Sequence, residues 1–289
     1  MTQLRGKGLG LAAISYDSTE ILGTFSQQHG ITFPLLSDPG SATIKAYGIL
    51  ATVAEEALDR GLDDPVLAAD VRLHVTQNAV NERVRGVPYP GTFMVDRQGR
   101  VTARFFEDFF RERNTVSSMM LKLGTGRPSV EGTQASTDHL DLKTYPSDAA
   151  VALGNRFSLV VDITPHKGMH VYAPGAAGYR VIALKIAPQS FVRVLPAQYP
   201  ASEIYVFKPL NERVEVFQKP FRLVQEVALS ASPDARKALA FVKTLSITGA
   251  LEYQACDDKV CFLSKSVPVT YTVRVRELDT ERATVPKPE

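Results

Sequence analysis

Cysteine is scarce in this sequence of 289 residues, which holds only Cys256 and Cys261. Because no cysteine precedes Cys256, the first part of the chain has no thiolate for nucleophilic or redox chemistry. Long apolar runs are lacking as well. The run at Leu9 to Ser15 is far shorter than the ~20 residues that a membrane-spanning helix needs. We therefore expect a chain that is not integral to the membrane.

A surplus of one charge is also missing. Lys and Arg total 33, Asp and Glu total 31, and no basic cluster stands out along the chain. Nucleic-acid-binding proteins carry a basic patch, so we expect no nucleic-acid partner. Hydrophobic residues at 44% and charged residues at 22% are typical of a globular protein. Since single hydrophobic cores rarely grow past ~250 residues, the length favours two domains.

We expect no signal peptide in the first residues of this sequence. The opening MTQLRGKGLGLAAIS places basic residues before an apolar run. However, Gly8 and Gly10 interrupt the run, and no small-x-small cleavage site follows it. The segment is more typical of a strand that leads directly into a helix.

The chain up to Gly124 alternates strand and helix patterns, which predicts an α/β domain over residues 1–124. Leu9 to Ser15 is a short apolar strand, and the helical pattern after it ends at Gly30. Residues 52–85 have a helical but polar pattern, typical of an inserted helical pair or lid. GTFMVD, RQGR and VTARFF then predict an antiparallel hairpin.

The composition changes after that domain. Residues 125–138 are small, polar and aperiodic, which predicts a linker. Runs of Val, Ile, Tyr and Phe then recur between Pro and Gly turns, and in SVPVTYTVRVR apolar residues occupy every second position. Repeated half-buried strands at this spacing predict an antiparallel β-sandwich over residues 139–276. The tail at 277–289 is predicted to be disordered.

The stretch YQACDDKVCFL holds both cysteines. In an extended strand their five steps would separate the Cα atoms by ~16 Å, whereas a disulfide needs ~4.4 to 6.8 Å. Asp257, Asp258 and Lys259 are turn-forming residues between β-patterned flanks, so a hairpin can bring the two sulfurs together. A loop this small stabilises a fold by ~2 to 3 kcal/mol at most, and strained, accessible disulfides are easily reduced.

Spacing alone leaves four interpretations of the pair: a redox couple, a structural disulfide, two reduced bystanders, or half of a metal site. The metal site would add His166 and His170, with Met169 as a soft ligand. However, H-x3-H places both imidazoles on one face only in a helix, and MHVYA is typical of a strand. A C-x2-C zinc spacing is absent. We therefore expect no metal and no other cofactor.

The second part resembles the N-terminal domain of the thiol:disulfide interchange protein DsbD, a family also described as disulfide bond corrector domains. The resemblance lies in PHKGMHVYAPG, LSITGALEYQACDDKVCFL and the VPVTYTV strand, and it covers roughly Asp138 to Arg276. It implies an immunoglobulin-like fold whose disulfide receives electrons from a membrane partner and passes them to periplasmic substrates. Carried over to this chain, it makes Cys256 and Cys261 the redox pair, with Cys261 forming the mixed disulfides.

The first part resembles the redoxins, meaning antioxidant peroxiredoxins of the AhpC/TSA type and their thioredoxin-fold relatives. The resemblance lies in GLAAISYDSTEILGTFSQQHGITFPLLSDPGSATIKAYGI and GVPYPGTFMVDRQGRV, and it implies a cis Tyr89–Pro90 bond. Those families begin with a strand and helix whose junction carries the reactive cysteine, and this chain starts one strand later. The missing strand lies between the counterparts of 9–15 and 93–96. We expect either that a longer natural chain supplies it or that this domain is a degenerate platform.

Together, these patterns favour a thiol-disulfide oxidoreductase or electron-relay protein that uses Cys256 and Cys261. Its partner would be another dithiol or disulfide protein, either a membrane electron donor or a thioredoxin-like protein. The family resemblance implies a periplasmic location, and peroxidase activity is not expected without a cysteine in the redoxin part. Two alternatives are a non-enzymatic partner-binding module with a structural disulfide and a truncated peroxiredoxin-like antioxidant protein.

Residues beside the pair are candidates for supporting roles. Tyr253 and Phe262 flank the cysteines and could shield them from small oxidants, although aromatic residues in strands are more often part of the core. Asp257 and Asp258 could position the two sulfurs through the turn.

Overall fold

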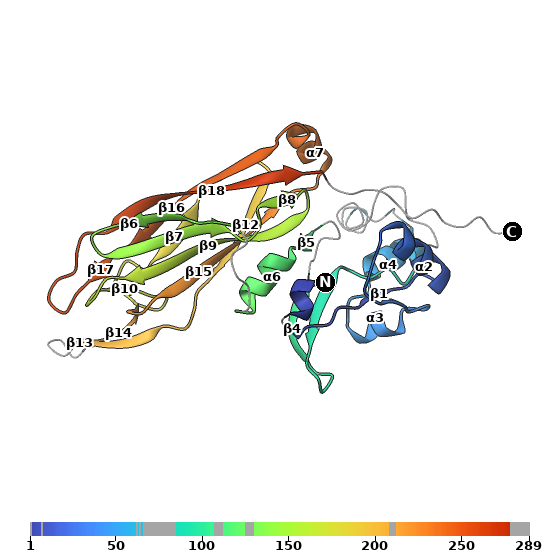
Figure 1. The fold of residues 1–289 in the computed structure, drawn as a ribbon, viewed down its shortest axis with the longest axis horizontal. Coiled ribbons are helices and arrows are strands. Elements are labelled where there is room, and N and C mark those ends of the chain that lie inside the picture. Colours follow the sequence, from blue (N-terminus) through green and yellow to red (C-terminus); the bar gives the residue numbers. More distant parts are fainter. Residues whose placement is uncertain are drawn as a thin grey trace. The chain divides into compact units, whose positions relative to one another are not determined.

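The computed structural model describes residues 2–6, 8–61, 63, 65, 85–106, 112–124, 130–207 and 212–277. The chain divides into two compact units, one of residues 1–110 with 279–289 and one of residues 111–278. Figure 1 labels most of the helices and strands of both units.

The first unit is a small α/β unit. Its described elements are α1 (Thr2–Arg5), β1 (Ala13–Ser15), α2 (Thr19–Gln28), β2 (Leu35–Ser37), α3 (Ala42–Ala46), α4 (Thr52–Arg60), β3 (Gly91–Val95) and β4 (Val101–Phe106). Strands β1 and β2 are parallel and α2 connects them, as the alternating sequence pattern predicts. Strands β3 and β4 form the predicted antiparallel hairpin.

The described strands of this unit lie in two separate sheets. Among the described residues, β1 pairs with β2 and β3 pairs with β4 in two separate two-stranded sheets. Apolar side chains remain exposed on both sheets, including Ile14 at 43% and Val101 at 49%. This separation agrees with the redoxin resemblance, in which a further strand lies between the counterparts of β1 and β3.

Two expectations for this unit have different outcomes. Helix α4 begins the predicted insertion at 52–85, and most of the remainder, 66–84, lies outside the described residues. The expected cis Tyr89–Pro90 bond is wrong, because the described residues contain no cis peptide bond. X–Pro bonds favour trans by ~0.5 to 1 kcal/mol unless the surroundings impose cis. The Tyr89 N–H donates to the Ile49 carbonyl at 2.6 Å.

The second unit is rich in β-strands. Its described elements are β5 (Arg113–Asn114), α6 (Val116–Lys122), β6 (Thr133–Ser136), β7 (Leu140–Pro146), β8 (Ala150–Ala152), β9 (Asn155–Pro165), β10 (His170–Tyr172), β11 (Ala183–Ile186), β12 (Val192–Gln198), β13 (Glu203–Phe207), β14 (Glu212–Phe217), β15 (Phe221–Leu229), α7 (Pro233–Leu239), β16 (Thr244–Tyr253), β17 (Ala255–Cys256) and β18 (Lys265–Arg276).

Three sheets of these strands enclose the core. The largest has the order β12-β15-β9-β7-β6, the second β11-β16-β18-β8, and the third β13-β14-β10-β17. Strand β18 confirms the predicted alternation, since Val269, Tyr271 and Val273 are buried and the residues between them are exposed. These side chains pack in one cluster with those of β9 and β15, so the unit has a sandwich-type core. The immunoglobulin-like arrangement stays a prediction.

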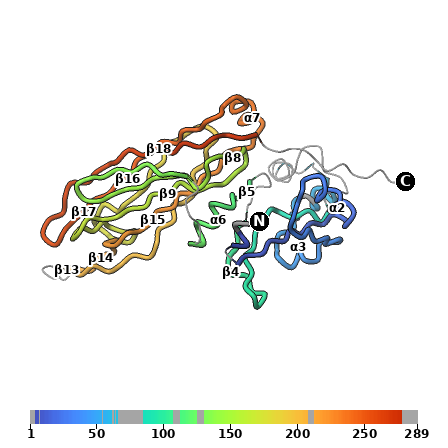
Figure 2. The backbone as a smooth tube through the Cα atoms, in the orientation of Figure 1, coloured from blue at the N-terminus to red at the C-terminus, as the bar shows by residue number. Residues whose placement is uncertain are grey.

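The long strands give this unit two distinct ends. Figure 2 traces β16 and β18 along its length, with β17 at one end and β8 at the other. Because β17 lies at one of these ends, the cysteines lie at that end, which we call the tip of the unit.

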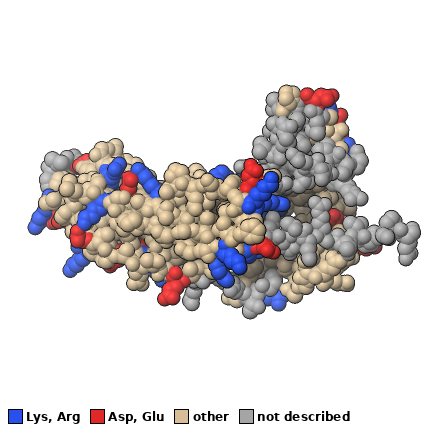
Figure 3. All heavy atoms as spheres, turned by 90° about the horizontal axis from the view of Figure 1, so that it is seen from above, with Lys and Arg blue, Asp and Glu red and all other residues tan. Residues whose placement is uncertain are grey.

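On the face seen in Figure 3, basic and acidic side chains are interspersed, in keeping with totals of 33 and 31.

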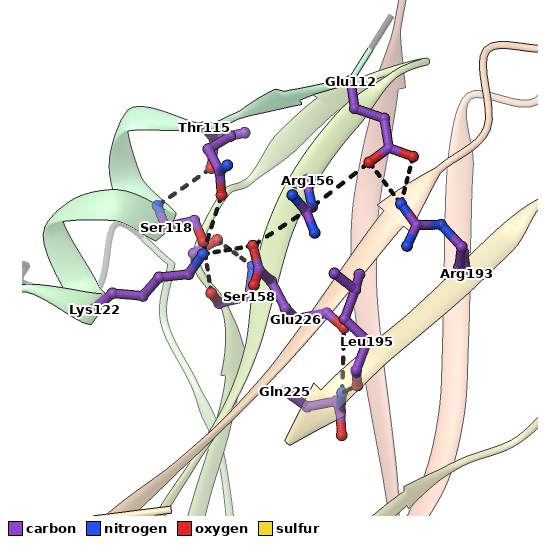
Figure 4. Close-up of polar contacts among 12 residues, drawn as sticks. Glu112, Thr115, Ser118, Lys122, Arg156, Ser158, Arg193, Leu195, Gln225 and Glu226 are labelled. Atoms are coloured by element: carbon purple, nitrogen blue, oxygen red, sulfur yellow. Dashed lines mark hydrogen bonds and ion pairs between the residues drawn. The ribbon is translucent and has the colours of Figure 1, made fainter. Parts of the chain in front are cut away.

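The structure differs from the predicted domain boundary at 124. Strand β5 pairs in parallel with β9, so the second unit already includes this segment. The hydroxyls of Ser118 in α6 and Ser158 in β9 hydrogen-bond at 2.7 Å. Lys122 Nζ lies 2.5 Å from a carboxylate oxygen of Glu226, which lies 3.8 Å from Arg156 (Figure 4). These three charged side chains are between 10% and 15% exposed, so the pairs fix α6 on the large sheet.

Glu112 extends these ion pairs to a further strand. Its carboxylate lies 3.6 Å from Arg156 and 2.6 Å from Arg193 of β12 (Figure 4). Residues 133–136, inside the predicted linker at 125–138, form β6 and pair with β7. Residues 125–129, and the predicted tail from residue 278 onward, lie outside the described residues.

Candidate functional site

Cys256 and Cys261 form a disulfide across a tight turn. The two residues face each other in an isolated antiparallel bridge, and their Cα atoms are 4.1 Å apart. Two backbone hydrogen bonds close the turn, from Asp257 N–H to the Val260 carbonyl at 3.0 Å and from Phe262 N–H to the Ala255 carbonyl at 2.9 Å. The hairpin predicted from the turn residues is thus confirmed, and the disulfide that the family resemblance implied closes across it.

The Asp257 side chain organises the turn. Its Oδ1 accepts from the backbone N–H groups of Lys259 at 2.7 Å and Val260 at 2.6 Å. These donors lower the pKa of the carboxyl, and the Lys259 and His170 side chains lower it further. An ionised Asp257 therefore holds the loop that carries Cys261 in one conformation.

The two sulfur-bearing residues differ in exposure. Cys256 is 1% exposed and packs in a small cluster with Tyr172, Val214 and Val216. Cys261 lies at the end of the turn and is exposed. A thiolate from another protein can therefore reach Cys261, whereas Cys256 is covered.

The Tyr172 hydroxyl lies beside the disulfide, within hydrogen-bonding distance of both sulfurs. Its oxygen is 3.1 Å from Cys256 Sγ and 3.3 Å from Cys261 Sγ. Disulfide sulfur carries no hydrogen, so the tyrosine O–H is the donor. Burial raises the pKa of Tyr172, which keeps the hydroxyl protonated. The Tyr179 ring stacks on Tyr172 with centroids 4.0 Å apart, and its hydroxyl donates to Glu212 at 2.7 Å.

The disulfide opens on a small cavity of about 200 Å³. Aromatic side chains form much of its lining, and the lining residues that matter for the chemistry are His170, Tyr172, Tyr179, Glu212, Cys256 and Cys261. His170 and Cys256 are direct partners in the antiparallel pairing of β10 and β17. Burial lowers the pKa of His170, and the negative charge of Asp257 opposes this shift.

The other candidate residues lie in different surroundings. Tyr253 is fully buried in the main core, and its hydroxyl donates to Thr137 at 2.9 Å. Phe262 is half-buried, with its ring 4.4 Å from that of His139, and Asp258 is exposed. Their roles as shielding or positioning groups stay predictions. Pro90 belongs to the first unit.

The two histidines of HKGMH have different surroundings. His166 Nε2 is 3.2 Å from Asp141, and its Nδ1 is 3.1 Å from the Asp138 carbonyl, whereas His170 lines the cavity. The part of the chain that the structure describes holds no group of three His, Cys, Asp or Glu residues placed to bind a metal ion.

Sequence reasoning missed Tyr172, Tyr179 and Glu212. Tyr172 is separated from the cysteines by 84 and 89 positions, so nothing in the local pattern connects them. The only sequence feature that pointed to Tyr172 was the segment PHKGMHVYAPG, which contains it and is one of the segments that carried the family resemblance. The pairing of β10 with β17 brings Tyr172 to the cysteines.

The fold and the site together define a two-unit protein with an accessible disulfide at one tip of a β-sandwich. Residues 1–104 match the AhpC/TSA family, and residues 143–270 match the family described as thiol:disulfide interchange protein DsbD, N-terminal. Both assignments agree with the resemblances seen in the sequence. No curated protein is significantly similar to the chain.

Several solved structures resemble part of the chain. The N-terminal periplasmic domain of ScsB from Proteus mirabilis is 12% identical, with a TM-score of 0.34 over 47% of this chain and 49% of that one. The chain thus spans about half the length of that relative. The reduced N-terminal domain of DsbD from Neisseria meningitidis is 14% identical, with a TM-score of 0.28 over 40% and 81% of the two chains. The SrpA adhesin from Streptococcus sanguinis is 14% identical, with a TM-score of 0.24 over 52% and 61%.

Membrane-spanning helices were sought among the same described residues. None of the helices there is long and apolar enough to cross a bilayer.

Proposed function

We propose that this chain is a thiol-disulfide oxidoreductase that exchanges two electrons with a partner dithiol through Cys256 and Cys261. The observation that carries the proposal is the asymmetric site. An exposed Cys261 is bonded to a Cys256 that is 1% exposed, and the Tyr172 hydroxyl lies 3.1 and 3.3 Å from the two sulfurs. Such an arrangement gives a partner thiolate one sulfur to attack and gives the other sulfur a hydrogen-bond donor when it leaves.

The reaction runs through a mixed disulfide. A partner thiolate attacks Cys261 Sγ, the Cys256–Cys261 bond breaks, and its electron pair leaves on Cys256 Sγ. The Tyr172 O–H donates to this thiolate. The partner's second thiolate then attacks the partner's own sulfur in the mixed disulfide and releases Cys261 as a thiolate. The partner ends as a disulfide, and this chain, with two electrons and two protons gained, ends as a dithiol.

The same steps run in reverse, so the site supports reduction or oxidation of a partner. The family match at 143–270 favours a partner that is itself a thiol-disulfide protein, either a membrane electron donor or a thioredoxin-like protein. The ScsB relative is titled a periplasmic domain, and we propose that location for this chain.

We propose a division of labour between the two units, a redoxin-like unit up to residue 110 and a β-sandwich unit from residue 111. The redoxin-like domain holds no cysteine, so every thiol reaction of this chain takes place in the sandwich. The first domain then serves as a platform or contact surface rather than as a peroxidase.

Single-cysteine variants of the full chain test the mechanism. Cys256→Ser leaves the exposed thiol of Cys261, and Cys261→Ser leaves the buried thiol of Cys256. We expect Cys256→Ser to form an adduct with oxidised glutathione much faster than Cys261→Ser, measured by intact mass. Equal rates would contradict the assignment of Cys261 as the attacked sulfur.

The reduction potential tests the function itself. Wild-type chain is equilibrated in glutathione buffers, and its dithiol fraction is measured by alkylation. We expect a midpoint reduction potential at which the cellular glutathione pool can both reduce and reoxidise the cysteine pair. A midpoint below about −300 mV, together with a lower melting temperature on reduction, would show a structural disulfide and favour a binding module. Peroxide consumption above that of the double-serine variant would instead indicate an antioxidant enzyme.

A further inference from the structure

The buried cysteine poses a proton-transfer problem. In the dithiol form Cys256 must lose its proton before it can attack a mixed disulfide on Cys261. Its side chain is 1% exposed and packed among apolar groups, an environment that disfavours the thiolate. A protein group beside the sulfur is therefore better placed than bulk water to take the proton, because Cys256 is almost fully covered.

His170 lies in the position to do so. It is the direct antiparallel partner of Cys256, so both side chains project from the same face of the sheet. Directly opposed residues have Cβ atoms ~4.5 to 5.5 Å apart, a distance that an imidazole and a thiol span with a hydrogen bond. Both residues line the cavity of about 200 Å³, and His170 is 4% exposed.

The remaining groups around the cavity are less suited to accept the proton. The titratable and charged side chains that face it come from β10, β13, β14, the segment between β10 and β11, and the turn: Tyr172, Tyr205, Glu212, Tyr179, Asp257 and Lys259. Tyr172 is a donor, since burial raises its pKa. Asp257 is held ionised by two backbone N–H groups, which lower its pKa. Burial lowers the pKa of His170, so its imidazole is neutral and free to accept at neutral pH.

We propose that His170 is the general base for Cys256 in the step that resolves the mixed disulfide, an inference that rests on the proposed function. His170 takes the proton from the Cys256 thiol. The resulting thiolate, which accepts a hydrogen bond from Tyr172, attacks Cys261 Sγ. The bond from Cys261 to the partner sulfur breaks, and the electron pair leaves on the partner thiolate, which takes up the proton.

The experiment uses the reduced full chain and one equivalent of 5,5′-dithiobis(2-nitrobenzoate). Attack by Cys261 releases a first coloured thiolate, and attack by Cys256 on the mixed disulfide releases a second. The second phase is intramolecular, so its rate does not depend on reagent concentration. We expect its rate in the wild type to level off above an inflection below pH ~6.5, the ordinary pKa of histidine.

Substitution of His170 separates its base role from its packing role. In His170→Phe, which keeps a ring in the cluster, we expect the second phase at pH 7 to slow by about 100-fold, the lower end of general-base effects. The inflection due to histidine should disappear from the pH profile. If His170→Phe does not fold, His170→Gln takes its place and should show the same two changes. His166→Phe is the matched control, because His166 contacts Asp141 outside the cavity. Added imidazole should partly restore the second phase of His170→Ala.

The outcomes separate this inference from the function on which it rests. An unchanged second phase in both His170 variants, with the same inflection, would overturn the role of His170. A wild-type chain with the histidine-dependent second phase but a midpoint below about −300 mV would overturn the proposed function alone. A wild-type chain that gives no second phase would overturn both.

Discussion

Replacing Tyr172 with Phe tests how the protein sets the reducibility of its disulfide. The substitution keeps the ring that stacks on Tyr179 with centroids 4.0 Å apart. It removes only the hydroxyl, which lies 3.1 Å from Cys256 Sγ and 3.3 Å from Cys261 Sγ. A disulfide sulfur is a weak acceptor and a thiolate is a strong one, so the hydroxyl stabilises the reduced, ionised form more than the oxidised form.

The expected shift follows from this difference. A hydrogen bond to a charged group contributes ~1.5 to 3 kcal/mol. For a two-electron couple ~1.4 kcal/mol corresponds to 30 mV. At a pH high enough to ionise Cys256 in the dithiol, the Tyr172→Phe potential should therefore be about 30 to 65 mV more negative than that of the wild type. The difference should shrink as the pH is lowered, because Cys256 in the dithiol is then a neutral thiol.

The assay is an equilibrium titration in dithiothreitol redox buffers, with the dithiol fraction measured by alkylation and mass. Tyr253→Phe is the matched control, since its hydroxyl donates to Thr137 and not to a sulfur. We expect its potential to stay close to that of the wild type. A Tyr172→Phe potential that equals the wild-type value, or lies above it, would refute the proposed role of the hydroxyl.

Two further predictions concern stability. Burial lowers the pKa of both His139 and His170, so below pH ~6.5 the unfolded chain binds more protons and the free energy of unfolding falls. Thermal melts should show a lower melting temperature at pH 5.5 than at pH 7.5, and His139→Gln should reduce that difference; an equal loss in the variant would contradict it. Glu226→Ala leaves Lys122 and Arg156 nearly buried without their shared carboxylate and should cost about 3 kcal/mol in urea unfolding. Lys219→Ala, which breaks an exposed pair with Glu203, should cost less than about 1 kcal/mol, and similar costs for the two variants would refute the distinction.

Local patterns predicted the elements that depend on neighbouring residues. The alternation in VPVTYTV gave the inward face of β18, and the turn residues after Cys256 gave the hairpin that closes the disulfide. Contacts between distant segments were not predictable in this way. His170 faces Cys256 only because β10 pairs with β17, a choice of register that no local pattern encodes.

The position of α6 was missed for the same reason. The stretch VSSMMLKLG shows a helix, but its sequence does not show which unit the helix packs against. The deciding contacts, Ser118 with Ser158 and Lys122 with Glu226, span 40 and 104 positions. Partly buried polar pairs over such separations become visible only once the sheet is assembled.

Strand β18 has a consequence for how the unit can be attached to other molecules. It begins at Lys265, shortly after Cys261, and ends at Arg276, which pairs with Ala152. At ~3.3 Å per residue this strand spans about 35 to 40 Å. The chain enters the unit beside the same far end, where Arg113 pairs with Asn155. A surface or fusion partner joined at that end would leave the disulfide at the tip open to solution. That end is therefore the suitable point at which to attach the unit to an electrode or a sensor.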